Sequence, residues 1–238
     1  MKVKICGLTR PEDVVFLNGL PVDFAGFIFV PSSPRCLDLM TAREVVPLLR
    51  EGIKKVGVFL DDDSARVIEI ARALHLDLLQ FHGEETPGYC ARFDIPYLKT
   101  IRVKDRIEKD ALRGYHPEAF LLDTYLPHVH GGTGKTFDWS IARTLREQGY
   151  RFLLAGGLNP ENVGRAISEV RPWGVDVSSG VEASPGVKDH KKLKAFIAAT
   201  RTKRGGGTVS TCQFGNLRGG GTGGGGTVST CQLGKLTS

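Results

Sequence analysis

Two side chains that can transfer protons each close a short apolar run of the sequence. Cys6 ends the run Lys2–Cys6, and Asp123 ends the run Ala119–Asp123. A thiolate can accept a proton and a neutral carboxyl group can donate one, so both residues are candidates for acid–base chemistry. The alternatives are a small buried packing residue for the cysteine and a structural hydrogen bond for the aspartate.

Arg35 and His82 are candidates for contacts with a substrate. Arg35 follows a loop that Pro31 and Pro34 stiffen, and a guanidinium group can bind a carboxylate through two parallel hydrogen bonds. An ordinary surface arginine is the alternative. His82 follows the apolar run Leu78–Phe81, where it either lines a pocket or forms only local hydrogen bonds.

Two later segments have the composition of phosphate-binding loops. Gly156-Gly157 and Ser179-Gly180 each follow an apolar run near the end of the candidate domain. Glycines let backbone N–H groups approach phosphate oxygens, and the loops after the last two strands of an eight-stranded α/β barrel commonly bind phosphate. A third segment, Gly131–Thr136, lacks the first glycine of a nucleotide-binding P-loop, because Val129 stands in its place.

These residues are positioned by eight apolar runs that alternate with amphipathic stretches. The runs are Lys2–Cys6, Phe24–Val30, Lys55–Leu60, Leu78–Phe81, Tyr97–Ile101, Ala119–Asp123, Phe152–Ala155 and Val175–Val177. Continuous apolar runs are typical of parallel strands that are buried on both faces. Eight strand–helix units in about 200 residues predict a single (β/α)8 TIM barrel, an α/β fold, with an open doubly wound sheet as the rival.

Helix signals fit this alternation. Asn159 before Pro160 predicts one helix start, and Ser64 predicts another N-cap. Near the end of the barrel, we expect Leu193 to face inward and Lys188, with the lysines that follow it, to cover a polar face.

The composition changes after Arg201. Gly205–Leu217 and Gly224–Leu236 are two similar copies of a unit that contains GGGTVSTCQ. Two short glycine-rich copies cannot bury a core, and solenoid folds need about three or more repeats. We therefore expect residues 1–201 to form the barrel and residues 202–238 to form a flexible, disordered tail.

Charge and composition bound the partners. The net charge is +6, and four of the lysines and arginines lie in the segment from residue 203 onward, which leaves +2 for the rest of the chain. The barrel segment has no basic stripe with interleaved aromatic residues, so nucleic acid is not an expected partner, whereas a small basic surplus suits a phosphorylated small-molecule substrate. No apolar run approaches the roughly 20 residues of a membrane helix and the N-terminus lacks a signal-peptide pattern, so we expect a cytoplasmic protein without a membrane partner.

The five cysteines show no Cys-x-x-Cys pair and no zinc-ligand spacing. We therefore expect reduced thiols and no metal site.

An ordered set of segments resembles one enzyme family. The segments are Lys4–Leu8, Gly26–Phe29, Ser33–Arg35, Gln80–Gly83, Gly131–Trp139, Ala155–Leu158 and Asp176–Glu182. Together they resemble phosphoribosylanthranilate isomerase over residues 2–201, and the tail has no counterpart in that pattern.

The resemblance implies an Amadori rearrangement of N-(5-phosphoribosyl)anthranilate in tryptophan biosynthesis, without a cofactor or a metal, by a monomer or a homodimer. It implies that Cys6 is the general base, Asp123 the general acid and Arg35 the ligand of the anthranilate carboxylate. It also places the phosphate at Gly156, Gly157, Ser179 and Gly180.

Two rival functions are weighed against this one. A histidine-pathway phosphoribosyl sugar isomerase performs the same type of rearrangement, but that family resembles a two-aspartate system with a second phosphate site, and Cys6 argues against it. A non-catalytic phosphate-binding barrel is disfavoured because candidates for an acid, a base and a substrate arginine occur together.

Overall fold

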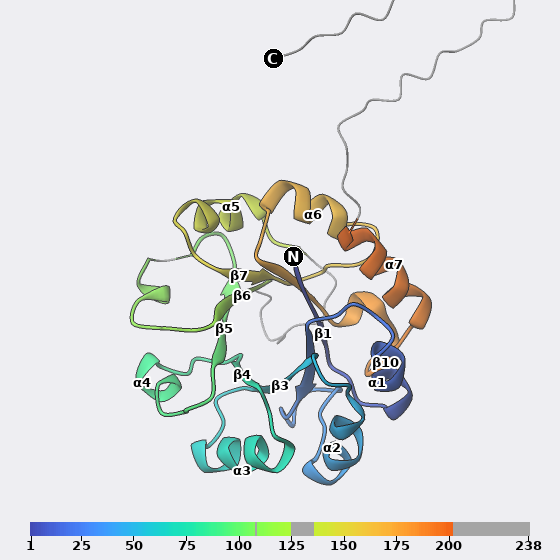
Figure 1. Ribbon diagram of the computed structural model, residues 1–238. Coiled ribbons are helices and arrows are strands. Elements are labelled where there is room, and N and C mark those ends of the chain that lie inside the picture. The colour runs from blue at the N-terminus through green and yellow to red at the C-terminus, as the bar shows by residue number, and fades with distance from the viewer. Residues whose placement is uncertain (108, 125–135, 202–238) are drawn as a thin grey trace, which may run out of the picture. The chain divides into compact units, whose positions relative to one another are not determined.

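A closed barrel of eight parallel strands forms the centre of the protein. The computed structural model describes residues 1–107, 109–124 and 136–201, and its helices surround the barrel as an outer ring (Figure 1). The strands are β1 (Lys2–Cys6), β2 (Phe24–Ile28), β3 (Lys54–Phe59), β4 (Leu78–Phe81), β5 (Tyr97–Val103), β6 (Ala119–Thr124), β7 (Phe152–Leu154) and β8 (Gly174–Val177). β1 pairs with β8 in parallel, so the sheet has no free edge. This closure confirms the TIM barrel and excludes the open doubly wound sheet.

Helices and short turns connect successive strands. The helices are α1 (Pro11–Leu17), α2 (Leu39–Val45), α3 (Ser64–Leu74), α4 (Pro87–Cys90), α5 (Trp139–Glu147), α6 (Val163–Val170) and α7 (His190–Arg201), with the 3-10 turns η1 (Val46–Leu48), η2 (Lys109–Leu112) and η3 (Ser179–Val181). A small antiparallel hairpin of β9 (Glu182–Ser184) and β10 (Val187–Lys188) lies between η3 and α7.

The strands separate two hydrophobic cores. Residues two apart on a strand share a face, so Leu78, Gln80 and His82 point into the barrel, whereas Leu79 and Phe81 pack against the helices. The inner core consists of Phe24, Val56, Leu78, Leu98, Ala119, Leu121, Leu153 and Ala155. The lower part of the barrel is therefore filled with apolar side chains, and polar inward-facing residues are found above it.

Two helix starts differ from the sequence expectation. α3 is capped by Asp63, whose carboxylate accepts hydrogen bonds from the N–H groups of Ala65 and Arg66, so Ser64 is the first helical residue rather than the cap. α6 begins at Val163, because Asn159 and the three residues after it form a separate turn in which the Asn159 carboxamide accepts from two backbone N–H groups.

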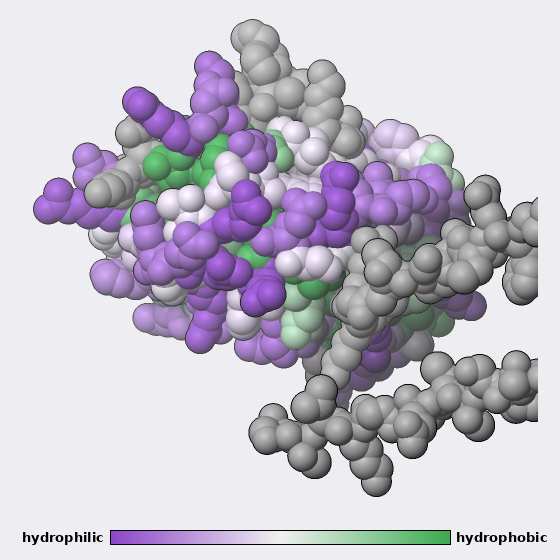
Figure 2. Space-filling view, turned by 90° about the horizontal axis from the view of Figure 1, so that it is seen from above, coloured by the Kyte–Doolittle hydropathy of each residue, from purple (hydrophilic) through white to green (hydrophobic). Residues whose placement is uncertain are grey.

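The described helices are short, and α7, with 12 residues, is the longest of them. None of these helices is long and apolar enough to cross a bilayer. Hydrophilic side chains cover most of the face that Figure 2 shows. The expected tail, residues 202–238, and most of the glycine-rich segment at residues 131–136 lie outside the described residues.

Candidate functional site

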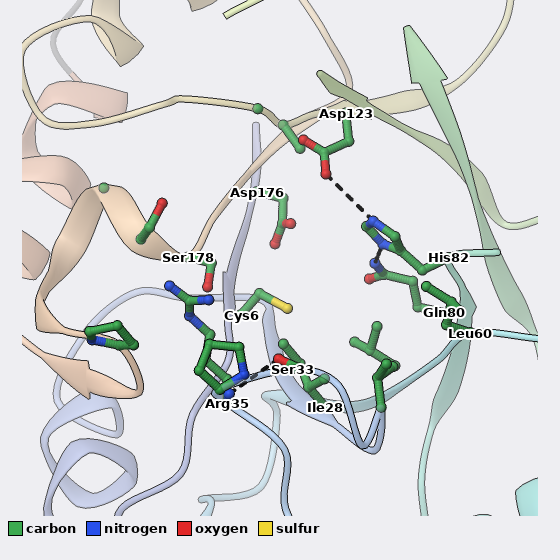
Figure 3. A pocket seen from close by; sticks show the side chains of 18 of the residues that line it. Cys6, Ile28, Ser33, Arg35, Leu60, Gln80, His82, Asp123, Asp176 and Ser178 are labelled. Carbon is green, nitrogen blue, oxygen red and sulfur yellow. Dashed lines mark hydrogen bonds and ion pairs between the residues drawn. The ribbon is translucent and has the colours of Figure 1, made fainter. Parts of the chain in front are cut away.

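A cavity of about 470 Å³ opens at the carboxyl ends of the barrel strands (Figure 3). All eight residues that the sequence predicted for the site line this cavity: Cys6, Arg35, His82, Asp123, Gly156, Gly157, Ser179 and Gly180. Cys6 on β1 and Asp123 on β6 enter it from strands that lie across the barrel from each other. The barrel thus brings residues from six loops and strand ends to one site.

Cys6 lies next to a fully buried lysine. The missing side chain of Gly26 on β2 makes room for both, because a Cβ there would lie 2.8 Å from the Cys6 sulfur and 3.1 Å from Nζ of Lys4. Lys4 donates to Oδ1 of Asp176 at 2.9 Å. Burial raises the pKa of the Cys6 thiol, while the positive charge of Lys4 acts in the opposite direction.

Arg35 is held by an internal carboxylate. Its Nε lies 2.9 Å and its Nη2 lies 2.7 Å from the two oxygens of Glu182, which is a forked, two-point pairing. Lys188 donates to the same Glu182 carboxylate at 2.7 Å and to the backbone oxygen of Cys6 at 2.6 Å. Burial raises the pKa of Glu182, but Arg35 and Lys188 outweigh it, so the net direction is downward.

The position of Lys188 differs from the sequence expectation. It lies on β10 rather than on a solvent-facing helix, and its side chain is 0% exposed. The helical period of α7 does not extend back to residue 188, because the β9–β10 hairpin precedes the helix and directs Lys188 toward Cys6 and Glu182.

The charged side chains around Cys6 are unequal in number. Lys4, Arg35 and Lys188 supply three positive charges, and Asp176 and Glu182 supply two negative charges. An ionised Cys6 would balance this buried group. These positive charges act to stabilise a thiolate, but burial of the sulfur is the larger effect, so the net direction of the Cys6 pKa is upward.

Asp123 contacts a histidine and a backbone amide. Oδ1 accepts from the N–H of Thr124 at 2.8 Å, and Oδ2 lies 3.5 Å from Nε2 of His82. On its other side, Nδ1 of His82 lies 3.1 Å from Nε2 of Gln80 and 3.2 Å from Oγ1 of Thr100. Figure 3 shows the three side chains of Gln80, His82 and Asp123 in a row along one wall of the cavity.

The two predicted phosphate loops lie side by side. Gly156 and Gly157 both have positive φ angles, +79° and +64°, which glycine adopts readily. A Cβ on Gly180 would overlap the carbonyl oxygen of Leu158, so this position requires glycine for the loops to approach each other. The Asn162 side chain ties the loops to α6 by donating to the Gly157 carbonyl at 2.9 Å.

The rest of the cavity has an apolar wall. Ile28, Val30, Val58 and Leu60 line the side formed by β2 and β3. The segments that follow β3 and β4 carry the acidic residues Asp61, Glu84 and Glu85, which do not line the cavity. Glu85 is buried and paired with Lys99, and Glu84 pairs with Arg102.

The sequence interpretation missed several polar residues of the site. Lys4, Gln80 and Asp176 each stand two positions before a strand-end residue of the cavity and therefore face inward below it. Counting back by two from Cys6, His82 and Ser178 would have found them, since each is polar within an apolar run. Glu182 and Lys188 gave no comparable signal, because they depend on the hairpin.

Some buried polar atoms of the cavity have no hydrogen-bond partner. Among the described residues, four buried side-chain atoms are of this kind, and three of them belong to cavity residues: Oε1 of Gln80, Nε2 of His82 and Oγ of Ser178. Such atoms in a pocket are natural contacts for a polar ligand. Within the same residues, no group of three or more histidine, cysteine or acidic side chains is placed to hold a metal ion.

Comparisons with known proteins agree with one another. The family model of N-(5'phosphoribosyl)anthranilate (PRA) isomerase matches residues 3–199. An N-(5'-phosphoribosyl)anthranilate isomerase of Trichlorobacter lovleyi is 43% identical over 197 residues, which cover 83% of this chain and 96% of the relative.

Two solved structures are similar over the same region, and each match covers 84% of this chain and 98% of the solved one. One is a phosphoribosyl anthranilate isomerase in complex with reduced 1-(o-carboxyphenylamino)-1-deoxyribulose 5-phosphate, with a TM-score of 0.73 and 37% identity. The other contains monomers generated from the dimeric enzyme of Thermotoga maritima, with a TM-score of 0.73 and 39% identity.

Proposed function

The chain belongs to the N-(5'-phosphoribosyl)anthranilate isomerase family, and we propose that Cys6 and Asp123 carry out the proton transfers of its reaction. The protein is an aldose–ketose isomerase of tryptophan biosynthesis. It converts N-(5-phosphoribosyl)anthranilate to 1-(2-carboxyphenylamino)-1-deoxyribulose 5-phosphate. The observation that carries the proposed roles is the placement of a thiol and a carboxyl group on opposed strands of one cavity.

The cavity fits the three parts of this substrate. The backbone amides of the Gly156-Gly157 and Ser179-Gly180 loops would bind the phosphate at one end. Glu182 engages Nε and Nη2 of Arg35, and the Nη1 donors would bind the anthranilate carboxylate. The apolar wall that includes Ile28 and Leu60 would contact the aromatic ring.

In the first step, Asp123 acts as the general acid. Its proton passes to the ring oxygen of the ribose, the bond between that oxygen and C1′ breaks, and the nitrogen lone pair forms a protonated Schiff base. The resulting Asp123 carboxylate is stabilised by the Thr124 N–H group at 2.8 Å.

In the second step, the Cys6 thiolate acts as the general base. It removes the proton from C2′, and the electron pair moves toward the nitrogen to give an enamine, which tautomerises to the ketose. Lys4 and Lys188 favour the thiolate through their positive charges.

Single substitutions test these roles. Cys6→Ala and Asp123→Ala should each lower kcat by at least about 10²-fold, since a positioned proton-transfer group contributes about that much. Cys36→Ala and Asp110→Ala, which change residues outside the cavity, should retain activity. Circular dichroism establishes that each variant is folded, and near-normal turnover of both cavity variants would overturn the assignment.

A single phosphate site separates this function from its rival. The segments after β3 and β4, on the side of the barrel opposite the two phosphate loops, carry the acidic residues Asp61, Glu84 and Glu85, which would not attract a second phosphate. Assays with the phosphoribosyl sugar substrate of the histidine pathway should therefore give far lower kcat/KM than assays with the anthranilate substrate.

The setting of the enzyme is part of the same proposal. Cys6, Cys36 and Cys90 are free thiols, which suits a reducing cytoplasm. Residues of one chain supply every proposed contact, so a monomer and a homodimer would both contain whole sites. We assign residues 1–201 to the catalytic barrel and residues 202–238 to an appendage that the reaction does not require.

A further inference from the structure

His82 connects the proposed general acid to a residue in the interior of the barrel. Its Nε2 lies 3.5 Å from Oδ2 of Asp123, and its Nδ1 lies 3.1 Å from the amide nitrogen of Gln80. Gln80 is only 1% exposed, and its amide oxygen has no hydrogen-bond partner among the described residues. The state of this imidazole therefore depends on few contacts.

The Gln80 contact selects one protonation state. The amide nitrogen can only donate, and it lies 3.1 Å from Nδ1 of His82 and 3.4 Å from Oγ1 of Thr100, whose hydroxyl can donate or accept. A proton on Nδ1 would place two donors face to face. The imidazole then carries its one proton on Nε2, directed toward Asp123.

Charged side chains come from every segment near the ring. Asp123 on β6, Asp61 after β3, and Glu84 and Glu85 on the loop after β4 are acidic, and Lys99 and Arg102 on β5 are basic. Lys99 pairs with Glu85 at 2.9 Å and Arg102 with Glu84 at 3.3 Å. Asp123 is the acidic group next to the ring itself, with Oδ2 3.5 Å from Nε2 of His82.

An imidazolium next to Asp123 would be harmful to the reaction. The positive charge would stabilise the Asp123 carboxylate, which has no proton to give to the ribose ring oxygen. A neutral imidazole with its proton on Nε2 leaves Asp123 able to be protonated, and it donates to the carboxylate once the proton has left.

We propose that Gln80 is a positioning residue that keeps His82 neutral, with its proton on Nε2, so that Asp123 can serve as the general acid. The proposal rests on the proposed role of Asp123. Gln80 acts through His82: it determines which ring nitrogen of His82 carries a proton, and it does not contact the reacting atoms.

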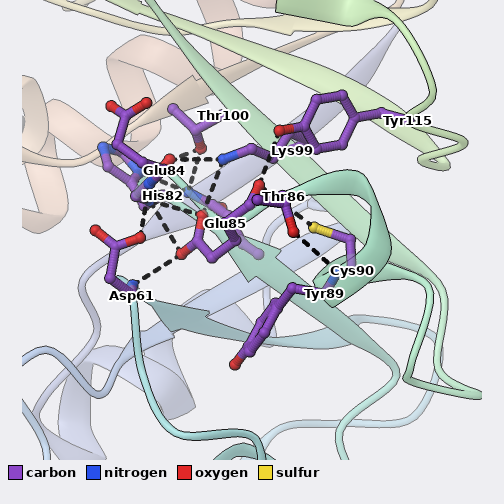
Figure 4. A network of polar contacts seen from close by, with 12 residues as sticks. Asp61, His82, Glu84, Glu85, Thr86, Tyr89, Cys90, Lys99, Thr100 and Tyr115 are labelled. Atoms are coloured by element: carbon purple, nitrogen blue, oxygen red, sulfur yellow. Dashed lines mark hydrogen bonds and ion pairs between the residues drawn. The ribbon is translucent and has the colours of Figure 1, made fainter.

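The loop that carries His82 is fixed by a second network (Figure 4). The carboxylate of Glu85 accepts from the N–H of Gly83 at 3.0 Å and from Lys99 at 2.9 Å, and Lys99 also donates to the Gly83 carbonyl at 2.6 Å. Both backbone polar groups of the residue after His82 are thus held, which limits reorientation of the ring away from Gln80.

Nitrogen NMR of protein labelled with ¹⁵N-histidine tests the state directly. The chain has six histidines, and a His82→Asn variant identifies the signals of residue 82. Near pH 7 the spectrum should show a neutral ring with the proton on Nε2. An imidazolium, or a neutral ring with the proton on Nδ1, would overturn the proposal.

Gln80→Glu provides the matched kinetic test. A carboxylate accepts a proton from Nδ1, so His82 should become an imidazolium, and kcat near pH 7 should fall at least about tenfold, with the loss at alkaline pH beginning at lower pH. Gln148→Glu adds the same charge at the exposed end of α5 and should leave the profile unchanged. An unchanged profile in folded Gln80→Glu would contradict the proposal.

The two readouts separate this inference from the proposed function. The NMR state of His82 in the wild-type enzyme does not depend on activity. If Asp123→Ala keeps its turnover, the role of Asp123 fails and the purpose assigned to Gln80 fails with it. If Asp123→Ala is inactive and His82 is an imidazolium, only the role of Gln80 is wrong.

Discussion

The ammonium group of Lys4, which has no exposure to solvent, lies beside the sulfur of Cys6, and both atoms border the space left by the missing side chain of Gly26. Both residues come from β1 and are two positions apart, so the pleat of one strand fixes their proximity. Attraction to Asp176 and Cys6 outweighs the effect of burial and raises the pKa of Lys4, so this cation persists at every pH at which the enzyme would work.

Replacing Lys4 with methionine should therefore suppress the thiolate of Cys6. A nearby opposite charge shifts a pKa by about one unit or more, so the pKa of Cys6, already raised by burial, should rise further. Alkylation by iodoacetamide should require higher pH, and kcat at neutral pH should fall at least about tenfold.

The double variant Lys4→Met/Asp176→Asn removes the buried carboxylate that the single variant leaves without its partner, and it should regain stability while remaining slow. Lys191→Met, at an exposed position of α7, is the surface control. Unchanged alkylation rates across pH in the single variant would show that Lys4 does not influence the sulfur.

Glu182 should make the stability of the barrel depend on pH. Its pKa is lowered in the folded state, so its stabilising contribution is present above the ordinary carboxyl pKa of about 4.3 and disappears as the pH falls through the lower folded value. Glu182→Gln should lower the free energy of unfolding at pH 7 by about 3–5 kcal/mol, because Arg35 and Lys188 lose their buried partner.

Urea unfolding at pH 7 and near pH 3 measures this effect, and the difference between wild type and variant should narrow at the lower pH. Glu169→Gln changes an exposed ion pair on α6 and should alter stability by about 1 kcal/mol or less. An equal difference at both pH values would contradict the assignment.

Arg35 should contribute to binding more than to chemistry. Arg35→Lys keeps the charge but loses the forked geometry, so KM for the anthranilate substrate should rise several-fold with a smaller change in kcat. Steady-state kinetics of this variant and of Arg113→Lys, which changes an exposed arginine, provide the comparison. An unchanged KM would count against contact with the substrate carboxylate.

The Gly180 loop should determine affinity for phosphate. Gly180→Ala places a Cβ against the Leu158 carbonyl, which forces the two loops apart and weakens their joint binding of the phosphate oxygens. Inhibition by inorganic phosphate should weaken at least about tenfold, as expected when a charge-assisted hydrogen bond is lost. Gly88→Ala adds a methyl group where no atom lies within 4 Å and should bind phosphate normally.

Deletion of residues 202–238 should leave kcat and KM unchanged. Each group that we assign to substrate binding or proton transfer lies between Lys4 and Lys188. Complementation of a tryptophan auxotroph that lacks this isomerase, with the full and the shortened chain, compares the two in cells. Loss of growth or of activity with the shortened chain would show that the appendage is required.

The barrel and the members of the site could be predicted from the sequence to a large extent. The eight apolar runs coincide with the eight strands to within two residues at each end; for example, the predicted run Phe24–Val30 ends at Ile28 in the structure. Strand ends point to one rim in such a barrel, so Cys6, His82 and Asp123 could be grouped before any coordinates were known.

The ion pairs inside the site could not be predicted from the sequence. Lys4 and Asp176 lie 172 positions apart, and their pairing depends on the closure of β1 against β8. The contact of Lys188 with Glu182 requires the β9–β10 hairpin, whose two short strands have no hydrophobic period to identify them. The predicted helix start was wrong where two adjacent residues can both cap a helix, as Asp63 and Ser64 can at the start of α3.

The residues proposed for proton transfer and those proposed for substrate binding come from different parts of the fold. The groups proposed to move protons, and Lys4 and Gln80 beneath them, belong to the strands or stand directly at their ends, whereas Arg35 and the glycine pairs belong to the connecting segments. An engineer could therefore graft new connecting segments to recruit another phosphorylated amino-sugar. The strand residues proposed to transfer protons would stay in place while the substrate specificity changed.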